Sequence, residues 1–405
     1  MAMSDPKFPR LPQLSLMLKP ASAACNLRCR YCFYALDLKT GQERPSLPGM
    51  NIDSARLLID RALTVLRPGA SLQLIFQGGE PCLRGLDFFQ ELSAYVDFCQ
   101  QRQDLRVSYA LQTNGLFLNA AWLDYLKKRD FLVGLSFDGL IEEHDRYRLD
   151  AQGLGTAESV LLAQERLQEA AVPYNILATL TAQLARKPRE FWAFALERGW
   201  THIQCTPCMA PGAGQQEVYA LRPRLYYNFY KELFSCWKTS LEQGRYISVK
   251  LFDDLCNLYL ARWETACGLL GRCQPQLVVE ADGSVYPCDF YVTEACCLGN
   301  IHESSLEEML LSKNFRRFPE FDKSLPAICG SCPVQCRGGC KRLFPYTHVD
   351  DSGFCGFRAL LEAILPELLN TARRVLAGRH RATSAPDPGP SQQRPEAGAP
   401  PGGRL

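Results

Sequence analysis

Short apolar runs alternate with longer segments of helical spacing from the N-terminus to about residue 240. The runs have the length of strands, and the segments between them carry apolar residues three and four positions apart, as amphipathic helices do. The pattern predicts strands at residues 14–18, 72–76, 107–112, 131–136, 174–180 and 202–205. It predicts helices at residues 52–66, 86–101, 120–128, 155–170 and 188–197.

Six strands separated by helices imply right-handed crossovers and a parallel sheet. Six units are too few to close an eight-stranded barrel, so the α/β pattern predicts an open partial barrel or a doubly wound sheet. In either architecture, the loops that follow the carboxyl ends of the strands hold the functional site.

The alternation stops at Gly244, and the region from there to Cys355 is rich in Cys, Gly and short turns. Its core is too thin to stand alone, and bound metal clusters could supply the missing stability. Residues 360–375 then have the spacing of a closing amphipathic helix, kinked or restarted at Pro366. From Arg381 onward, ten of the last 25 residues are Pro or Gly, which is typical of a disordered tail. We therefore divide the chain into residues 1–243, 244–378 and 379–405.

The composition is that of an ordinary globular protein. Of 405 residues, 47% are apolar and 22% are charged, and 45 Lys and Arg face 43 Asp and Glu. A balance this even, without a basic stripe, predicts no binding to nucleic acid or to an anionic membrane surface. An apolar stretch of about 18 residues would be needed for a membrane span, and the sequence contains none.

The chain contains 19 cysteines, so the redox compartment decides what they do. The apolar run near the N-terminus is short and is broken by Lys19 and Pro20, so we expect no export signal and a cytoplasmic location. In a reducing compartment, clustered cysteines indicate metal ligands or redox chemistry rather than disulfides.

The first cysteine cluster follows the first predicted strand. Cys25, Cys29 and Cys32 form a C-x3-C-x2-C pattern, which can hold three irons of a 4Fe-4S cube and leave the fourth iron open. Structural zinc normally takes four ligands, and no fourth Cys or His lies nearby. With Tyr31 before the third cysteine, the pattern resembles the radical S-adenosylmethionine (SAM) superfamily. The resemblance implies a partial (β/α)6 barrel whose cluster binds SAM and cleaves it to a 5'-deoxyadenosyl radical.

Further motifs stand at the ends of the next strands. Gln77 is followed by Gly78, Gly79 and Glu80; the glycines allow close backbone approach to a ligand, and Glu80 can accept hydrogen bonds from an ammonium group. This turn resembles the GGEP motif of the superfamily, which holds the amino group of SAM. By resemblance, the SAM-binding residues are Gly78, Gly79, Glu80, Asn114, Ser136 and Arg148. Taken singly, each of them could instead be a turn or helix-cap residue.

A second set of cysteines occupies the last third of the chain. The order C-x9-G-x4-C from Cys273 through Gly283 to Cys288, followed by a later group, resembles the SPASM domain, an auxiliary-cluster extension of radical SAM enzymes. The resemblance implies two further 4Fe-4S clusters, three in all. It assigns the first to Cys267, Cys273, Cys288 and Cys340, and the second to Cys329, Cys332, Cys336 and Cys355. Only three residues separate Cys332 from Cys336, where the family usually has five, so the role of Cys336 stays open.

Eight cysteines remain outside these sets. Free cysteine packs as a small hydrophobe, so we expect most of them to be inert buried thiols. They are Cys82, Cys99, Cys205, Cys208, Cys236, Cys256, Cys296 and Cys297. Cys205 and Cys208 form a C-x2-C pair that could be a zinc or redox site, an alternative to which we give less weight.

Within the superfamily, the chain resembles the anaerobic sulfatase-maturating enzymes from about residue 14 to residue 366. The matching blocks are residues 19–22, 32–34, 76–81, 111–115, 131–136, 278–280, 286–292, 298–301 and 338–340. The resemblance implies oxidation of a Cys or Ser of a sulfatase to formylglycine, within a motif of Cys or Ser followed by x-Pro/Ala-x-Arg. It also implies a low-potential electron donor such as flavodoxin or ferredoxin, and a monomer.

The resemblance assigns three residues to the substrate. Asp289 directly follows the cluster ligand Cys288, so its carboxylate is tied close to the electron acceptor, and by resemblance it is the base that takes the substrate proton. Its alternative role is to cap a turn around the cluster. Tyr34 and Gln77 match the residues that contact the substrate peptide, and otherwise they would serve packing and loop hydrogen bonding.

Two other functions remain open at this stage. A peptide maturase that forms a thioether or another crosslink would use the same clusters. A multi-cluster electron carrier or zinc-binding interaction protein would explain the late cysteines but not the open triad or the GGEP turn.

Overall fold

The structure, a computed structural model, describes residues 9–35, 47–210, 217–320 and 324–383. Its frame is one ten-stranded sheet with the strand order β10-β9-β8-β1-β2-β3-β4-β5-β6-β7. Strands β1 to β7 are all parallel. They are β1 (Leu11–Leu18), β2 (Leu66–Phe76), β3 (Leu105–Thr113), β4 (Phe131–Ser136), β5 (Tyr174–Leu180), β6 (His202–Pro207) and β7 (Ser248–Val249). The six predicted strands are therefore confirmed, and β7 is an additional short strand.

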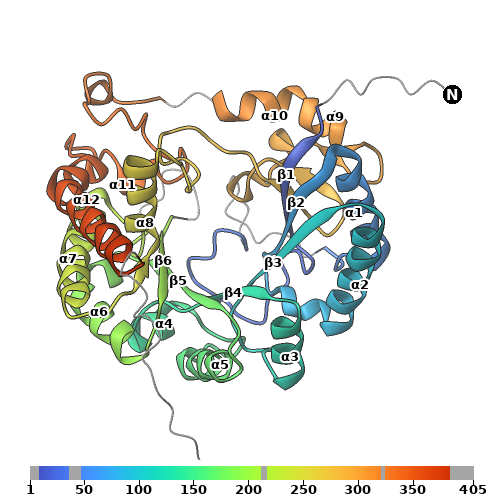
Figure 1. Ribbon diagram of the computed structural model, residues 1–405, viewed down its shortest axis with the longest axis horizontal. Coiled ribbons are helices and arrows are strands. Elements are labelled where there is room, and N and C mark those ends of the chain that lie inside the picture. The colour runs from blue at the N-terminus through green and yellow to red at the C-terminus, as the bar shows by residue number, and fades with distance from the viewer. Residues whose placement is uncertain (1–8, 36–46, 211–216, 321–323, 384–405) are drawn as a thin grey trace, which may run out of the picture.

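Helices connect these strands and cover one side of the sheet. Figure 1 shows the strands along the inner side of a ring and the helices outside it. The helices are α1 (Ile52–Val65), α2 (Leu86–Arg102), α3 (Ala120–Lys128), α4 (Ile141–Tyr147), α5 (Ala157–Glu169), α6 (Pro188–Glu197) and α7 (Pro223–Glu242). Because helices cover only the outer face and the edge strands β7 and β10 do not pair, the sheet is an open partial barrel rather than a doubly wound sheet.

Two of these helices, α4 and α7, were not predicted. Helix α4 is a two-turn element inside the loop after β4, too short to give a clear period. Helix α7 has helical spacing along Tyr226, Phe229, Tyr230 and Leu233, all buried, so its signal was present in the sequence.

The core lies between the sheet and the helices. Alternate residues of β2, Leu72, Leu74 and Phe76, are at most 1% exposed, as expected for a strand with one face under helices. Phe131 at the start of β4 is fully buried, stacks on Tyr109 at 5.0 Å between ring centres and lies 5.6 Å from Tyr125. Aromatic packing thus joins β2, β3, β4 and helix α3.

The region after residue 244 extends the same sheet. Strand β8 (Leu277–Val279) pairs in parallel with β1, with Leu18 opposite Val279, and β9 (Ser284–Tyr286) and β10 (Gly299–Asn300) continue it antiparallel. The other elements are α8 (Lys250–Cys256), the π-helix η3 (Asn257–Ala261), α9 (Leu306–Leu311), α10 (Lys313–Arg317), α11 (Phe344–Thr347) and α12 (Gly356–Thr383). Short 3-10 turns are η1 (Pro81–Arg84), η2 (Leu184–Arg186), η4 (Asp289–Tyr291), η5 (Glu294–Cys296), η6 (Phe318–Glu320) and η7 (Ala327–Cys329). The division of the chain at residue 243 stays a prediction, since the sheet crosses it.

The closing helix is longer than expected. Helix α12 begins at Gly356 and continues through Pro366 to Thr383, so it does not restart at the proline. It packs on α7, to which Glu367 is joined by an ion pair with Lys238. The predicted tail therefore begins as helix at residues 379–383, and its remainder, 384–405, lies outside the described residues. Among the helices described, none has the length and apolar character of a membrane span.

We expect Phe131→Ala to destabilise the barrel by about 3 to 5 kcal/mol, because it removes a large buried side chain that the surrounding rings cannot replace. The measurement is the apparent thermal unfolding midpoint, followed by circular dichroism. The matched control is Leu132→Ala, since the next side chain along the strand is 49% exposed. Equal losses for both variants would contradict the packing described for β4.

Candidate functional site

The first three predicted cluster ligands lie in the loop that leaves β1. Its backbone is anchored to the segment after α4, where Arg28 N donates to Leu149 O at 2.7 Å and Arg30 N donates to Tyr147 O at 3.0 Å. Burial raises the pKa of the Cys25 thiol to about 11 and that of Cys29 to about 12. Without a metal the thiols are thus neutral at pH 7, and thiolate ligation requires the cation to displace their protons.

The GGEP turn packs directly against this loop. Gly79 has a φ of +52°, and a Cβ there would lie 2.1 Å from the carbonyl oxygen of Ala24. Glu80 N donates to the same carbonyl at 2.8 Å. Only glycine therefore fits at position 79, and the turn and the cysteine loop are one rigid unit.

The Glu80 carboxylate is 1% exposed and accepts three hydrogen bonds from the chain. Oε1 accepts from Cys82 N at 3.1 Å and from Thr113 Oγ1 at 2.8 Å, and Oε2 accepts from Asn114 N at 2.8 Å. Burial raises the pKa of this carboxyl group. Glu80 thus joins the ends of β2 and β3, and its predicted bond to an ammonium group stays a prediction.

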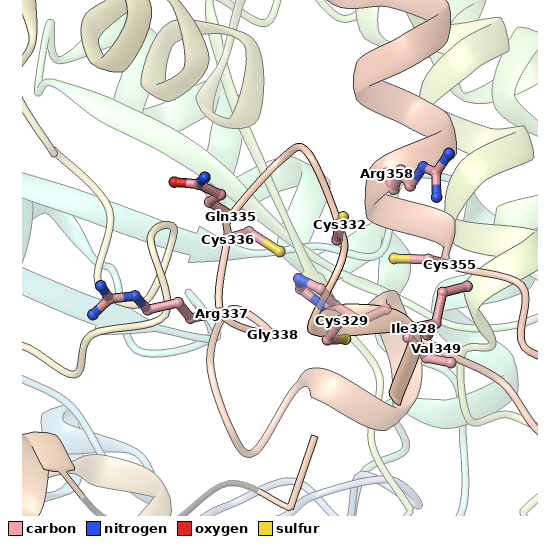
Figure 2. A pocket seen from close by; sticks show the side chains of 11 residues that line it. Ile328, Cys329, Cys332, Gln335, Cys336, Arg337, Gly338, Val349, Cys355 and Arg358 are labelled. Carbon is pink, nitrogen blue, oxygen red and sulfur yellow. The ribbon is translucent and has the colours of Figure 1, made fainter. Parts of the chain in front are cut away.

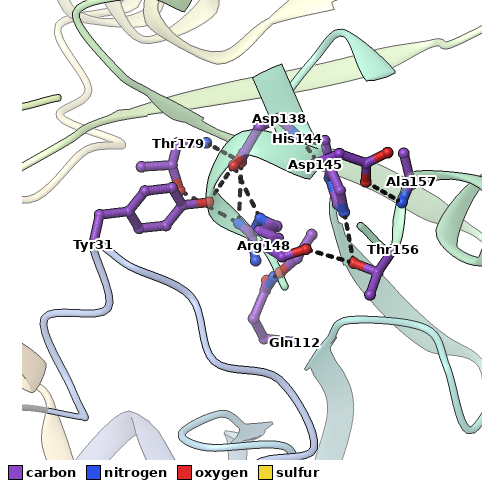
Figure 3. A network of polar contacts seen from close by, with 10 residues as sticks. Tyr31, Gln112, Asp138, His144, Asp145, Arg148, Thr156, Ala157 and Thr179 are labelled. Carbon is purple, nitrogen blue, oxygen red and sulfur yellow. Dashed lines mark hydrogen bonds and ion pairs between the residues drawn. The ribbon is translucent and has the colours of Figure 1, made fainter. Parts of the chain in front are cut away.

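A buried ion pair organises the next strand ends, as Figure 3 shows. Arg148 pairs with Asp138, with Nε 3.1 Å from Oδ2, and Thr179 N donates to Oδ1 at 2.8 Å. The Tyr31 hydroxyl donates to the same carboxylate, so the aromatic residue inside the cysteine triad is tied to β4. Ser136 accepts a hydrogen bond from Gln112 at 3.0 Å. Asp138 was not among the predicted site residues, although its place directly after β4 could have indicated that it belongs to the site.

The side chain of His144 supports this network. Its Nδ1 lies 3.3 Å from Asp138 N and its Nε2 lies 3.1 Å from Thr156 Oγ1 (Figure 3). Burial lowers the pKa of His144 to about 3, so the ring is neutral at pH 7. His144 therefore positions the loop after β4 and carries no charge there.

The predicted substrate residues meet on the other side of the barrel opening. Gln77 Nε2 donates to Asp289 Oδ2 at 2.8 Å, and the Tyr34 hydroxyl donates to Glu280. Lys19 lies between them, in an ion pair with Asp289 Oδ1 and with Nζ 3.7 Å from the centre of the Tyr34 ring. The structure thus brings Tyr34, Gln77 and Asp289 close together, and their roles toward a substrate stay predictions. It adds Lys19 and Glu280, to which the sequence analysis gave no role.

The first auxiliary set converges around Cys288. Cys267 lies within electrostatic range of Cys273 and Cys340, and Cys288 lies within range of Cys267 and Cys340. The Nζ atom of Lys341, next to Cys340, is buried 4.8 Å from the Tyr291 ring centre and 4.3 Å from that of Phe318. A cation therefore lies beside the four thiols, where it would offset the negative charge of a thiolate cluster.

The second auxiliary set lines one pocket, shown in Figure 2. Cys329, Cys332, Cys336 and Cys355 all face it, so the shortened spacing does not displace Cys336. The short connection ends with Gln335 in the left-handed region at φ +51°, and Arg337, directly after Cys336, is also left-handed at φ +48°.

These thiol sets fit iron–sulfur clusters. In the described part of the chain, no three His, Cys, Asp or Glu side chains are arranged to hold a single metal ion. Four thiols around a pocket match a cube that takes a thiolate at each corner, and the open triad matches a cube with one free iron.

The remaining cysteines are mostly buried, as expected. Cys208 packs against Tyr31 and Tyr147, and Cys205 is buried beneath the Tyr230 hydroxyl, which donates to its carbonyl oxygen. All nineteen cysteines are free thiols in the structure. Among the residues that the structure describes, Cys205 and Cys208 belong to no group of three side chains that could hold a metal ion.

Comparisons with known proteins agree with this site. Residues 20–192 match the radical SAM superfamily, and residues 267–333 match SPASM, an iron-sulfur cluster-binding domain. A cysteine-type anaerobic sulfatase-maturating enzyme of Clostridium novyi is 34% identical over 380 residues, which cover 91% of this chain and all of that protein. The chain belongs to the family of anaerobic sulfatase-maturating enzymes.

Other members of this family match as well. A serine-type anaerobic sulfatase-maturating enzyme of Klebsiella pneumoniae is 29% identical over 338 residues, 82% of this chain and 83% of that protein. The solved structure of native anSMEcpe with bound AdoMet and Cp18Cys peptide has a TM-score of 0.80 and 33% identity, and covers 90% of this chain and 100% of that one. Membership of the anaerobic sulfatase-maturating enzymes confirms the predicted partial barrel, the radical SAM oxidoreductase class, and SAM with iron–sulfur clusters as cofactors. It is consistent with three clusters.

The alternative functions gain no such support. The peptide-bound structure of Streptococcus suis SuiB has a TM-score of 0.58 at 16% identity, which shows a shared fold and nothing more. A simple electron carrier would not need the SAM-type barrel.

We expect Gly79→Ala to weaken SAM binding at least tenfold, because its Cβ would collide with a backbone carbonyl and push the turn away from the cysteine loop. Isothermal titration calorimetry on the reconstituted protein measures this, after circular dichroism has shown an intact fold. Gly85→Ala is the control, since its φ is also positive at +77° but nothing lies within 4 Å of its Cβ. Unchanged affinity in Gly79→Ala would show that the turn does not shape the ligand site.

We expect Cys336→Ala to lose one third of the iron, because it removes one of four ligands of a single cluster. Iron and acid-labile sulfide analysis, together with electron paramagnetic resonance, measures the loss. Cys236→Ala on helix α7 should retain the full content. Full iron content in Cys336→Ala would mean that another group completes this cluster.

Proposed function

We propose that this protein oxidises a Cys or Ser in a sulfatase to formylglycine without oxygen, with the residues predicted from the sequence in the roles given there. The observation that carries the proposal is that Asp289, Gln77 and Tyr34 lie close together. Tyr34 follows the first cysteine triad, and Asp289 follows the auxiliary-cluster ligand Cys288. A base beside a cluster ligand suits a reaction that removes both a proton and an electron.

When bound, the clusters and SAM would supply a hydrogen-abstracting radical and an acceptor for the second electron. Cys25, Cys29 and Cys32 would hold the SAM cluster, and the two later sets would hold the auxiliary clusters. Gly78, Gly79, Glu80, Asn114, Ser136 and Arg148 would bind and orient SAM. Their placement at neighbouring strand ends supports this, since the carboxyl ends of parallel strands meet at one edge.

On the substrate side, Asp289 would accept the proton of the substrate thiol or hydroxyl. Its carboxylate is 14% exposed, so it is shielded from bulk water yet reachable from the barrel opening. Tyr34 and Gln77 would contact the peptide, in the motif Cys or Ser followed by x-Pro/Ala-x-Arg. Gln77 contacts Asp289, and Tyr34 contacts Lys19. A peptide bound to Tyr34 or Gln77 would therefore also affect the position of the Asp289 carboxylate.

We further propose a cytoplasmic monomer that receives electrons from a low-potential carrier such as flavodoxin or ferredoxin. The arrangement of the cysteines in metal-ligand patterns supports a reducing compartment.

The test is mass spectrometry of sulfatase-motif peptides after anaerobic incubation with reconstituted protein, SAM and a strong reductant. One peptide carries Cys and the other Ser at the reacting position, because relatives of both types match the chain. We expect an aldehyde product formed in step with 5'-deoxyadenosine. Deoxyadenosine without any change in either peptide would contradict sulfatase maturation.

A further inference from the structure

We propose that Lys19 is the positioning residue of this site, which holds the Asp289 carboxylate in place for the second half of the reaction. The inference rests on the proposed function. It concerns a residue outside the predicted set, at the point where β1 ends.

Lys19 is buried to an extent that is rare for lysine. Its side chain is 1% exposed, and buried ammonium groups are tolerated only where a charge or hydrogen-bond partner compensates them. Here the partner is Asp289 Oδ1, and the face of Tyr34 lies 3.7 Å from Nζ. The ammonium group is therefore directed at one carboxylate and one ring, both in the predicted substrate site.

The backbone and the side-chain carbons of Lys19 also have defined neighbours. Lys19 N donates to Val279 O at 2.9 Å, which extends the pairing of β1 with β8 by one residue. On the other side Gly78 leaves the room for the stem, since a Cβ there would lie 2.8 Å from Lys19 Cγ. The backbone of Lys19 is thus fixed by β8, its side chain passes directly over Gly78, and Nζ ends at Asp289.

The two oxygens of Asp289 have different partners. Gln77 donates to Oδ2 at 2.8 Å and can orient the carboxylate, but it carries no charge. Lys19 holds Oδ1 and is the one ion-pair partner of Asp289 in the part of the chain that the structure describes. By contrast Glu80, the buried carboxylate at the next strand end, is held by neutral donors alone. A cation is thus placed at the carboxylate that the reaction uses.

The step that depends on this geometry is the second one. For a Cys substrate, bound SAM would supply the deoxyadenosyl radical that takes a hydrogen atom from Cβ, Asp289 would take the thiol proton, and the auxiliary clusters, when bound, would accept the one electron that must leave. The resulting thioaldehyde takes up water and releases hydrogen sulfide, which leaves the aldehyde. Because Lys19 acts through Asp289, its loss should affect the proton transfer and leave the first hydrogen abstraction intact.

The test compares Lys19→Met with wild-type holoenzyme on the Cys peptide. We expect iron content and peptide-dependent deoxyadenosine formation to be retained, and KM for the peptide to change little. Aldehyde formed per deoxyadenosine should fall by roughly one to two orders of magnitude. Lys238→Met, which breaks the exposed pair with Glu367, is the matched control and should behave as wild type.

A double variant makes the test independent of folding effects. If Lys19 acts through Asp289, Lys19→Met combined with Asp289→Asn should be no worse than Asp289→Asn alone. Independent losses that multiply, a wild-type product ratio in Lys19→Met, or loss of the clusters in that variant would each overturn the inference. Deoxyadenosine without aldehyde in the wild-type protein would overturn the proposed function, and the inference with it.

Discussion

The parallel pairing of β8 with β1 is the constraint on which the site depends. It is only three residues long, from Leu16 opposite Leu277 to Leu18 opposite Val279. Yet it sets the register between two parts of the chain about 260 residues apart, and a shift by one residue would turn every side chain to the other face. In the observed register, Lys19 and Glu280 leave neighbouring strand ends together, and the turn from β9 to Cys288 brings Asp289 to them.

The charges at the barrel opening are arranged as two separate buried pairs. Arg148 and Asp138 lie at the end of β4, and Lys19 and Asp289 lie where β1 meets β8. Each pair contacts an aromatic residue of the cysteine loop, Tyr31 inside the triad in the first case and Tyr34 just after it in the second. Buried ion pairs contribute little net stability but define geometry when their remaining atoms are bonded. The cysteine loop thus contacts a buried ion pair at each of these two places, in addition to its backbone hydrogen bonds and the packing of Tyr31 on Tyr147.

Much of the fold could be predicted from the sequence because the patterns that indicate it are local. The six strands and five helices follow from apolar periodicity, and Phe131–Ser136 and Ala120–Lys128 agree with their predicted bounds. The GGEP turn and the cysteine spacings are local too, so their residues could be named in advance. Lys19 was not predicted to belong to the site, because nothing in its neighbours along the chain shows that it meets Asp289. The extension of the barrel sheet by β8 was equally invisible, since three apolar residues have no period of their own. Helix α12 passes through Pro366 because tertiary packing on α7 overrides the local preference.

The pairing of β1 with β8, which are far apart in the sequence, also affects how the chain folds during synthesis. During synthesis the β1 edge emerges first, and its partner β8 follows only after the entire barrel has left the ribosome. Until then β1 presents unpaired backbone groups along one side, and an open strand edge invites pairing with other chains. Contacts of such high sequence separation also form slowly. The half-made protein is therefore most vulnerable to aggregation at the strand that later carries its active site, and slow, chaperone-rich expression is the condition that suits it.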